Sequence, residues 1–311
     1  MVKRTTLFGD LFRDSPLEKY AKYFYYGFKG EEWESSQIGT LNEGLWPNND
    51  TIKALNKVEK LYAENKFKFI FLDENKPDVN IMLMKQDKPS KLVLLAAGGA
   101  FASVATAIES LPVGMRLYDK GYSVALLTYS VGKEAALQGP YNDLLTAIRY
   151  LKKNGKRWGI DMKNFILGGF SAGAHVVARY GTNDVGYVMQ DLPKPGLMFL
   201  AYPVITMGDY ANSLCKEKVI GKNPTKKLIN NYSIENHVFS GFPTTYIWQC
   251  KNDRDVPVQN SKLLVDALLD NNVTYVYKTY DSKEHGWGIA TGKPAEGWVD
   301  DMEKFYRSLK Y

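Results

Sequence analysis

The chain of 311 residues is 45% hydrophobic and 24% charged, with a formal net charge of +6 at pH 7. This composition is typical of a globular protein and excludes a disordered or fibrous chain. The lysines and arginines are spread without a dense basic block, which argues against nucleic-acid binding. No apolar run reaches the roughly 18 residues of a membrane-spanning helix, so we expect no membrane association.

The N-terminal stretch contains basic residues, but Asp10 and Asp14 interrupt its apolar positions. We therefore expect no signal peptide. The two cysteines, Cys215 and Cys250, lie in no CxxC or Cys/His pattern, so neither a disulfide framework nor a zinc site is predicted. Together these features predict an intracellular, cytoplasmic protein. Nothing in the sequence indicates a cofactor, a nucleotide or a metal requirement.

Residues 1–65 are predicted to form a helical extension that precedes the main domain. Ser15-Pro16-Leu17-Glu18 has the pattern of a capping box with proline at the first helical position. The helix that begins there is rich in aromatic residues, namely Tyr20, Tyr23, Phe24, Tyr25 and Tyr26. These rings favour packing against the main domain, and the alternative is a cap whose rings line the active site. A second helix is predicted over residues 50–64.

Residues 66–311 are predicted to form one catalytic domain of the α/β class. Two short strands, 67–72 and 79–84, enclose a polar turn and indicate an antiparallel hairpin at the edge of a sheet. From residue 91 onward apolar strands alternate with helices, which predicts a mostly parallel sheet with helices on both faces. The expected strands are 92–96, 122–129, 165–168, 197–202, 245–250 and 273–280. The expected helices are 105–118, 141–153, 174–180, 260–269 and 296–309.

A polar, lysine-rich insert at 205–242 interrupts this alternation. Long inserts between core strands are often functional, so a lid over the active site is one interpretation. Ordinary elaboration of the surface is the other, and the sequence does not decide between them.

The residues around Ser171 have the pattern of a nucleophile elbow. An apolar strand leads into Gly169-Phe170-Ser171-Ala172-Gly173, and a helix-compatible run follows. The glycines on either side remove Cβ atoms that would clash in the strained turn. The serine oxygen is therefore expected above the sheet at the positive end of a helix, where an anionic intermediate is stabilised.

A serine nucleophile needs a base, and the chain has three histidines. His285 follows the last predicted strand in a loop that contains two glycines, so it is the predicted base. His175 lies on the same helix as Ser171 and is predicted to be a packed core histidine. His237 lies in the polar insert and is predicted at the surface or in the lid.

The acid that orients the base should follow the strand at 245–250. Asp253 and Asp255 both lie there, and Asp253 is preferred because it begins an Asp-x-x-Val-Pro pattern. Asp255 could instead bond the loop backbone or pair with Arg254. The chain order of serine, aspartate and histidine is the order of the α/β-hydrolase triad.

The oxyanion hole is expected after the strand at 92–96, in Ala97-Gly98-Gly99-Ala100-Phe101. The predicted donors are the backbone N–H groups of Gly99, Ala100 and Ala172. Phe101, Phe170 and Trp287 are predicted to crowd the substrate pocket, which favours a small acyl group such as acetyl.

From about residue 90 to its C-terminus the chain resembles the α/β-hydrolase superfamily, and within it the bacterial acetyl esterase and acetylxylan-esterase-like group. The matching motifs are Ala97–Phe101, Glu109-x-x-Pro112-Val113, Tyr129-Ser130-Val131, Gly169–Gly173 with His175, Tyr202–Ile205, Asp253-x-x-Val256-Pro257-Val258-x-Asn260-Ser261 and His285-Gly286. The resemblance implies Ser171, Asp253 and His285 as nucleophile, acid and base, with oxyanion donors near Gly99, Ala100 and Ala172.

Three positions depart from the family pattern. A third glycine is usual where Ala100 stands, and histidine or proline is usual where Ala97 stands. The glycine that usually precedes the acid loop is replaced by Cys250-Lys251. If the backbone at Ala100 has a positive φ, alanine is costly there.

The resulting hypothesis is a cofactor-free serine esterase that acts on a small-molecule ester with a short acyl group. Acetylated sugars or xylo-oligosaccharides as substrates follow from the resemblance only. Tyr129, Tyr202 or Trp287 could stack on sugar rings. The alternatives are a catalytically weak binding protein that keeps the fold, which Ala100 invites, and a peptidase or lipase. The sequence leaves homo-oligomerisation open.

Overall fold

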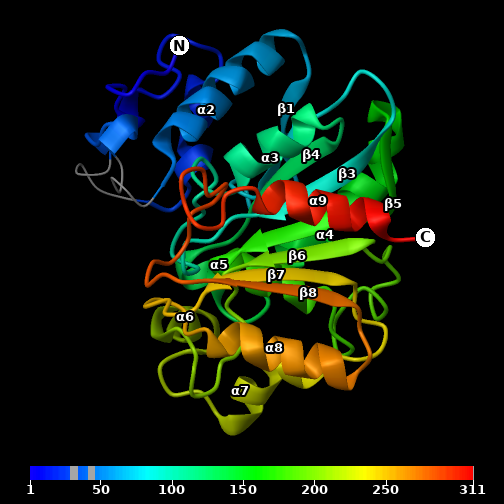
Figure 1. Cartoon of the computed structure of the whole chain (residues 1–311). Helices are drawn as coiled ribbons and strands as arrows, with labels where there is room; N and C mark the ends of the chain where they lie inside the picture. The colour runs from blue at the N-terminus through cyan, green and yellow to red at the C-terminus, as the bar shows by residue number, and fades with distance from the viewer. Residues whose placement is uncertain (29–33, 41–45, 311) are drawn as a thin grey trace.

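The computed structural model describes residues 1–28, 34–40 and 46–310. Within these residues the chain forms an eight-stranded sheet in the order β1-β2-β4-β3-β5-β6-β7-β8 (Figure 1). The strands are β1 (Phe67–Phe71), β2 (Asn80–Met84), β3 (Ser90–Ala96), β4 (Ser123–Thr128), β5 (Ile160–Phe170), β6 (Leu197–Ala201), β7 (Thr245–Cys250) and β8 (Tyr275–Tyr280). β1 and β2 pair antiparallel at one edge, and β3 to β8 run parallel. The predicted edge hairpin and mostly parallel sheet are confirmed.

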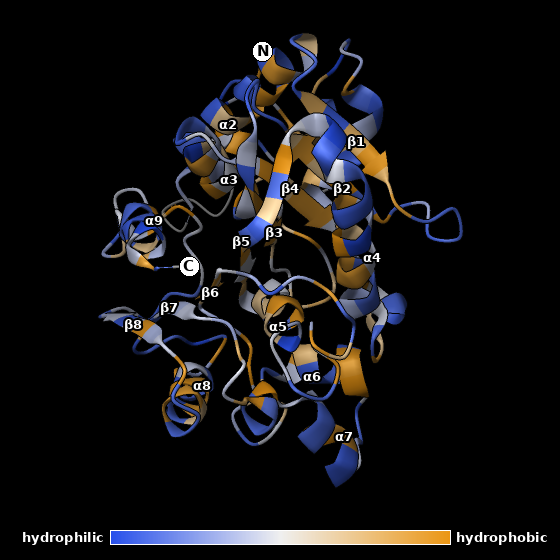
Figure 2. Cartoon of the chain, turned by 90° about the vertical axis from the view of Figure 1, so that its right-hand side faces the viewer, coloured by the Kyte–Doolittle hydropathy of each residue, from blue (hydrophilic) through white to orange (hydrophobic). Residues whose placement is uncertain are grey.

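Helices cover both faces of this sheet, as predicted. They are α2 (Asn48–Ala63), α3 (Ser110–Asp119), α4 (Gly139–Asn154), α5 (Ser171–Arg179), α6 (Ser213–Ile220), α7 (Lys226–Tyr232), α8 (Gln259–Asp270) and α9 (Trp298–Ser308). Residues of α2, α3 and α9 belong to one buried apolar cluster, and residues of α4, α5 and α8 belong to the other. Figure 2 shows α4 and α9 on opposite sides of the strands.

The alternating direction of side chains along each strand explains why a buried apolar cluster forms on each face of the sheet. In β3, Val93 and Leu95 belong to one cluster, and Leu92 and Leu94 belong to the other. Successive side chains of a strand point to opposite faces, so a continuous apolar run can only be buried if both faces are covered. In the part of the chain that the structure describes, no helix is both long and apolar enough to cross a bilayer.

The N-terminal extension contains a helix of a different type from the one predicted. Residues Glu18–Tyr25 form a 3-10 helix, not an α-helix, and the expected capping box is not made. The Ser15 hydroxyl accepts a hydrogen bond from the N–H of Leu17 at 3.3 Å, whereas the N–H of Glu18 donates to the Ser15 carbonyl at 2.9 Å. This three-residue spacing is that of a 3-10 turn. The second predicted helix is present as α2.

The insert at 205–242 is packed into the domain. Its helices α6 and α7 bury Cys215, Val219 and Tyr232 in the same cluster as α5 and α8. The side-chain oxygen of Asn260 on α8 also accepts hydrogen bonds from backbone N–H groups at the start of the insert. The insert therefore contributes to the core, and its role as a lid stays a prediction.

Candidate active site

Ser171 lies where β5 ends and α5 begins, at the carboxyl edge of the parallel strands. Its φ of +48° is in the left-handed region, which few side chains adopt. A Cβ on Gly169 would lie 2.6 Å from the Gly173 carbonyl oxygen. A Cβ on Gly173 would approach the carbonyl oxygens of Ala96 and Ala97 well inside the 3.0 Å limit that real Cβ atoms keep. Both glycines are thus required for space, which permits the sharp turn.

The structure brings Ser171, His285 and Asp253 into one hydrogen-bonded chain. His285 Nε2 lies 2.8 Å from Ser171 Oγ, and His285 Nδ1 lies 2.7 Å from Asp253 Oδ2. With its proton on Nδ1, the imidazole donates to the carboxylate and accepts from the serine hydroxyl. Asp253 follows β7, and His285 follows β8, so the two loops meet at the same sheet edge as the elbow.

Asp253, and not Asp255, is the residue that contacts the imidazole. Its second oxygen, Oδ1, accepts hydrogen bonds from the backbone N–H groups of Asp255 and Val256, both at 2.9 Å. Asp253 is 8% exposed, whereas Asp255 is exposed. The loop backbone therefore fixes the carboxylate of Asp253 in the orientation that reaches His285.

The charges around His285 favour the protonated form of its imidazole. Burial lowers the pKa of His285, but the hydrogen bond and the negative charge of Asp253 outweigh it, and the net pKa is raised above the ordinary 6.5. Asp255 and Glu109 add further negative charge in the same direction. A raised pKa is the expected result when a carboxylate stabilises the imidazolium that forms during proton transfer.

This shift predicts the pH dependence of ester hydrolysis. The base must be neutral to accept the serine proton, so kcat/KM should fall as the pH decreases through the pKa of His285. Because that pKa is raised, the midpoint of the acid limb is expected above 6.5. A profile of kcat/KM between about pH 5 and 9 measures it. Asp253→Asn should move the midpoint to lower pH, and a wild-type midpoint well below 6.5 would contradict the geometry.

The other two histidines are engaged elsewhere. His175 is 2% exposed, its Nε2 lies 2.8 Å from the Tyr232 carbonyl oxygen, and burial lowers its pKa to about 3. His237 lies in the insert, where its Nε2 is 3.0 Å from the Asn230 carbonyl oxygen. Neither ring is hydrogen-bonded to Ser171, which leaves His285 as the base that the geometry supports.

The predicted oxyanion turn follows β3 and has left-handed backbone at three successive residues. Gly99, Ala100 and Phe101 have φ values of +128°, +53° and +58°. Within the described residues, the N–H groups of Gly99 and Ala100 donate no hydrogen bond to another protein atom. The N–H of Ala172 lies in the first turn of α5, where N–H groups have no acceptor within the helix. Ala100 therefore has a positive φ, which glycine adopts without strain and which costs alanine about 1–2 kcal/mol.

The three aromatic residues predicted to crowd the pocket pack inside the domain. Phe170 meets Phe199 edge-on with ring centroids 5.6 Å apart, and Trp287 stacks on Trp248 at 6.0 Å. Phe101 lies edge-on to His175 at 5.9 Å. Phe101, Phe170 and Trp287 are each at most 1% exposed, so they belong to the packed interior. Their effect on acyl-chain length stays a prediction.

The suggestion that Tyr129, Tyr202 or Trp287 stack on sugar rings is wrong for this structure. All three side chains are 0% exposed, and stacking requires an accessible ring face. The Tyr129 hydroxyl donates to the Ala97 carbonyl at 2.6 Å, and the Tyr202 hydroxyl bonds Glu109 at 3.0 Å. These rings are held by the loops that surround the nucleophile.

The N-terminal extension contacts the loops of the site. The N–H groups of Val104 and Ala107 donate to the carbonyls of Tyr26 and Phe24 at 2.7 and 2.9 Å, so the extension runs along the chain that follows the oxyanion turn. A Cβ added to Gly286, next to His285, would lie 2.6 Å from the ring of Trp46. These contacts support the loops, and a capping role stays a prediction.

Glu109 is a buried acidic residue near the site that was not among the predicted site residues. The sequence placed it only in a family motif, yet the residue is 3% exposed and its carboxyl accepts a hydrogen bond from Gly98 in the predicted oxyanion turn. The available signal was its isolation, since it is the one acidic residue between Asp87 and Asp119 in a strongly apolar stretch. A charge in such a stretch is informative because burying it requires partners.

The described residues contain one group of acidic and histidine side chains close enough to hold a metal ion. It consists of Asp253, Asp255 and His285, with ligand atoms within 4.8 Å of one another. The two nitrogens of His285 are hydrogen-bonded to Asp253 and Ser171, so neither is directed at a shared cation position.

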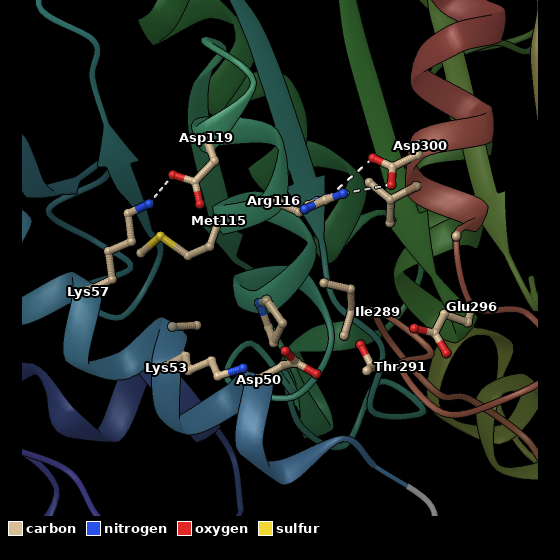
Figure 3. Close-up of a pocket in the computed structure, with 14 residues that line it drawn as sticks. Asp50, Lys53, Lys57, Met115, Arg116, Asp119, Ile289, Thr291, Glu296 and Asp300 are labelled. Atoms are coloured by element: carbon tan, nitrogen blue, oxygen red, sulfur yellow. Dashed lines mark hydrogen bonds and ion pairs between the residues drawn. The ribbon is translucent and has the colours of Figure 1, made fainter.

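A charged pocket of about 420 Å³ lies between α2, α3 and the segment that leads into α9 (Figure 3). Arg116 pairs with Asp300, and Lys57 pairs with Asp119 across it. Ser171, Asp253 and His285 are not among its lining residues. The pocket is therefore separate from the triad, and its charges largely neutralise one another.

Known proteins with similar sequences include carbohydrate-active enzymes. The family model described as BD-FAE matches residues 79–192, which contain the oxyanion turn and the elbow. Endo-1,4-beta-xylanase B of Butyrivibrio fibrisolvens is 27% identical over 249 residues, which cover 77% of this chain and 39% of the relative. Acetylxylan esterase of Xylanibacter ruminicola is 25% identical over 251 residues, which cover 78% of this chain and 51% of the relative. The chain thus spans about half or less of these relatives.

Similar solved structures agree with this result. The acetyl ester-xyloside bifunctional hydrolase from Caldicellulosiruptor lactoaceticus has a TM-score of 0.70 and 28% identity, covering 78% of this chain and 96% of that one. A carboxylesterase from Lactobacillus plantarum, at 22% identity, has a TM-score of 0.64 with coverage of 78% and 94%. The α/β-hydrolase fold and the resemblance to carbohydrate esterases of that fold are confirmed. The relatives' names agree with the predicted class, a carboxylic ester hydrolase.

Proposed function

We propose that this chain is a serine esterase in which Ser171, His285 and Asp253 form the catalytic triad. The observation that carries the proposal is the continuous hydrogen-bonded chain from Asp253 Oδ2 through His285 to Ser171 Oγ, with distances of 2.7 and 2.8 Å. These are distances at which a proton passes directly between the groups. A serine at left-handed φ is uncommon, and here the strain serves to present Oγ to the base.

The chemistry follows from the positions of these atoms. Ser171 Oγ attacks the ester carbonyl while His285 Nε2 accepts its proton, and Asp253 stabilises the imidazolium. The N–H groups of Gly99, Ala100 and Ala172 are the candidates to hold the oxyanion. His285 then protonates the leaving alcohol, and water, activated by the same imidazole, releases the acid from the acyl-enzyme.

The substrate class that we propose is a short-chain ester of an acetylated sugar or oligosaccharide. Support comes from relatives whose names contain acetylxylan esterase, xylanase and acetyl ester-xyloside hydrolase. A small acyl group is part of the proposal because the bulky residues Phe101 and Phe170, which are adjacent in sequence to the proposed oxyanion donor Ala100 and to Ser171, are both buried.

Hydrolysis of p-nitrophenyl acetate, butyrate and octanoate tests both parts of this proposal. We expect kcat/KM to fall with chain length, by about 10-fold or more between acetate and octanoate, because added methylenes would have to displace packed side chains. Ser171→Ala provides the background rate. Activity toward octanoate that equals or exceeds activity toward acetate would contradict a small acyl pocket. Hydrolysis of acetylated xylo-oligosaccharides would test whether the alcohol part of the substrate is a sugar.

One observation favours a second candidate, a binding protein that keeps the fold without efficient catalysis. Ala100 has a φ of +53°, so a side chain occupies the turn where a glycine is usual and strains the oxyanion donors. Labelling with a fluorophosphonate separates the two candidates, because only a competent serine and oxyanion hole react rapidly. Absence of labelling at Ser171 in the folded protein would favour the binding protein.

A further inference from the structure

A buried carboxylate outside the triad lies at the junction of the catalytic loops. Glu109 immediately precedes α3 and is 3% exposed. Its Oε2 accepts a hydrogen bond from the backbone N–H of Gly98, and its Oε1 accepts one from the Tyr202 hydroxyl at 3.0 Å. A buried carboxylate is costly unless it is hydrogen-bonded, so these partners must be maintained for the site to keep its shape.

Tyr202 extends this contact to the loop of the catalytic histidine. It directly follows β6, is 0% exposed and has a φ of +39°. Its hydroxyl oxygen accepts a hydrogen bond from the N–H of Gly288 at 3.3 Å. Its ring meets the His285 ring edge-on, with centroids 5.0 Å apart and an angle of 78° between the planes.

All of these hydrogen bonds point in one direction, toward the carboxylate. The N–H of Gly288 donates to the Tyr202 hydroxyl, the hydroxyl donates to Glu109, and the N–H of Gly98 donates to the other carboxylate oxygen. Only a group with two acceptor oxygens and no donor fits the centre of this chain. Three loops that are far apart in sequence are thereby joined at one carboxylate.

Gly98 lies between Glu109 and Ser171, with no space for a side chain. A Cβ added to Gly98 would lie 2.8 Å from Ser171 Cβ and 3.0 Å from Glu109 Oε2, so a single glycine separates the carboxylate from the nucleophile. Gly98 is also the residue before the predicted donor Gly99. Any movement of the Gly98 peptide would therefore change the position of the oxyanion donors relative to Ser171.

We propose that Glu109 is a positioning residue for ester hydrolysis, which holds the oxyanion turn through Gly98 and the His285 loop through Tyr202. This inference rests on the proposed esterase function. Glu109 does not touch the substrate, and it acts by fixing the two elements that must face each other across Ser171. A displacement of about 1 Å in such a site can lower the rate by about 100-fold.

The negative charge of Glu109 should affect the pKa of His285, which the pH dependence of kcat/KM can measure. Burial raises its pKa to about 7, against the opposing effect of the hydrogen bonds from Gly98 and Tyr202. Four titratable groups face it: Tyr25 from the N-terminal extension, Tyr129 after β4, Tyr202 after β6 and His285 after β8. Burial keeps the pKa of each tyrosine well above its ordinary range, so His285 is the group whose titration near neutral pH responds to Glu109.

Glu109→Gln tests the proposal, because it keeps the shape of the side chain but removes the charge and one acceptor. We expect kcat for p-nitrophenyl acetate, expressed per serine titrated with a fluorophosphonate, to fall by about 10- to 100-fold with KM changed less than about 3-fold. The acid limb of kcat/KM should move to lower pH, since a negative charge that raises the pKa of His285 is lost. Wild-type kcat and an unmoved acid limb would overturn the inference.

Asp143→Asn is the matched control for a purely structural effect. Asp143 on α4 is also 3% exposed, and it accepts hydrogen bonds from the backbone N–H of Ser130 at 2.7 Å and from Lys76 at 2.6 Å. Its neutralisation should lower stability while kcat per titrated serine and the acid limb stay at wild-type values. If Asp143→Asn lowers kcat as much as Glu109→Gln does, the effect is general destabilisation and the inference fails.

Tyr202→Phe completes a double-mutant cycle with Glu109→Gln. If Glu109 acts on the histidine loop through the Tyr202 hydroxyl, the double variant should lose less kcat than the product of the two single losses. Multiplicative losses would overturn that link.

The rate constant for fluorophosphonate labelling of Ser171 separates failure of this inference from failure of the proposed function. A wild-type chain that is neither labelled nor active on any ester refutes both. A wild-type chain that is labelled, with Glu109→Gln labelled equally fast, refutes only the positioning role.

Discussion

Replacing Ser171 with alanine is expected to lower kcat for p-nitrophenyl acetate by about 10⁴- to 10⁶-fold with little change in folding stability. The variant removes the hydroxyl oxygen that lies 2.8 Å from Nε2 of His285, the proposed base. Alanine and serine have the same Cβ, so the strained φ of +48° costs both about equally. Steady-state kinetics and urea unfolding on the same preparation measure the two quantities.

The proposed triad predicts that the losses from two substitutions will not add, because the members of a triad act as a unit. The double variant Ser171→Ala with His285→Ala should be no slower than Ser171→Ala alone, since the base has nothing to activate once the nucleophile is absent. A further fall of 10-fold or more in the double variant would mean that His285 acts through another group. Retention of more than about 1% of wild-type kcat by Ser171→Ala would refute Ser171 as the nucleophile.

Gly173→Ala is expected to destabilise the fold by on the order of 3 kcal/mol or more. The added Cβ would collide with the carbonyl oxygens of both Ala96 and Ala97, where β3 continues into the oxyanion turn. Backbone atoms of a central strand cannot rotate away as a side chain can, so α5 or the turn must shift. Urea unfolding midpoints and the fluorophosphonate labelling rate should both fall.

Gly121→Ala is the control that separates crowding from backbone strain. Gly121 has a φ of +94°, but a Cβ there would meet nothing within 4 Å. Its substitution should cost only the strain of a left-handed alanine, about 1–2 kcal/mol, and should leave the labelling rate unchanged. If Gly173→Ala costs no more than Gly121→Ala, close approach is not what requires glycine in the elbow.

The positive φ of Ala100 and the burial of Glu109 affect the same turn in opposite ways. Alanine at +53° strains the backbone that should present the oxyanion donors, whereas the hydrogen bond from Gly98 to Glu109 holds the preceding peptide in place. The turn is therefore kept in an unfavourable conformation by contacts from outside it, which is how strained catalytic backbone persists.

Much of the fold could be read from the sequence because it depends on local pattern. The continuous apolar runs of β3 and β5 required burial on both faces, and that requirement alone predicts parallel strands covered by helices. The Gly169–Gly173 pentapeptide identified the elbow, because few sequences tolerate its backbone. At Glu18–Tyr25 the predicted helix is present as a 3-10 helix, but the capping box is not made, and the Ser15 hydroxyl accepts from the N–H of Leu17 instead.

Chain order and loop position were enough to predict that His285 meets Ser171, because the carboxyl ends of parallel strands share one edge of the sheet. They left Asp253 and Asp255 as candidate partners of His285, and the Asp-x-x-Val-Pro pattern favoured Asp253, which the structure places against the imidazole. Only the tertiary structure placed Tyr202 and Trp287 as buried supports and not as exposed sugar platforms, since burial depends on what packs against a residue. It alone showed that Glu109 joins Gly98 to Tyr202 and Gly288. Those contacts span separations of 11 to 93 residues, and no local pattern encodes a hydrogen bond between loops that meet only after the whole sheet has formed.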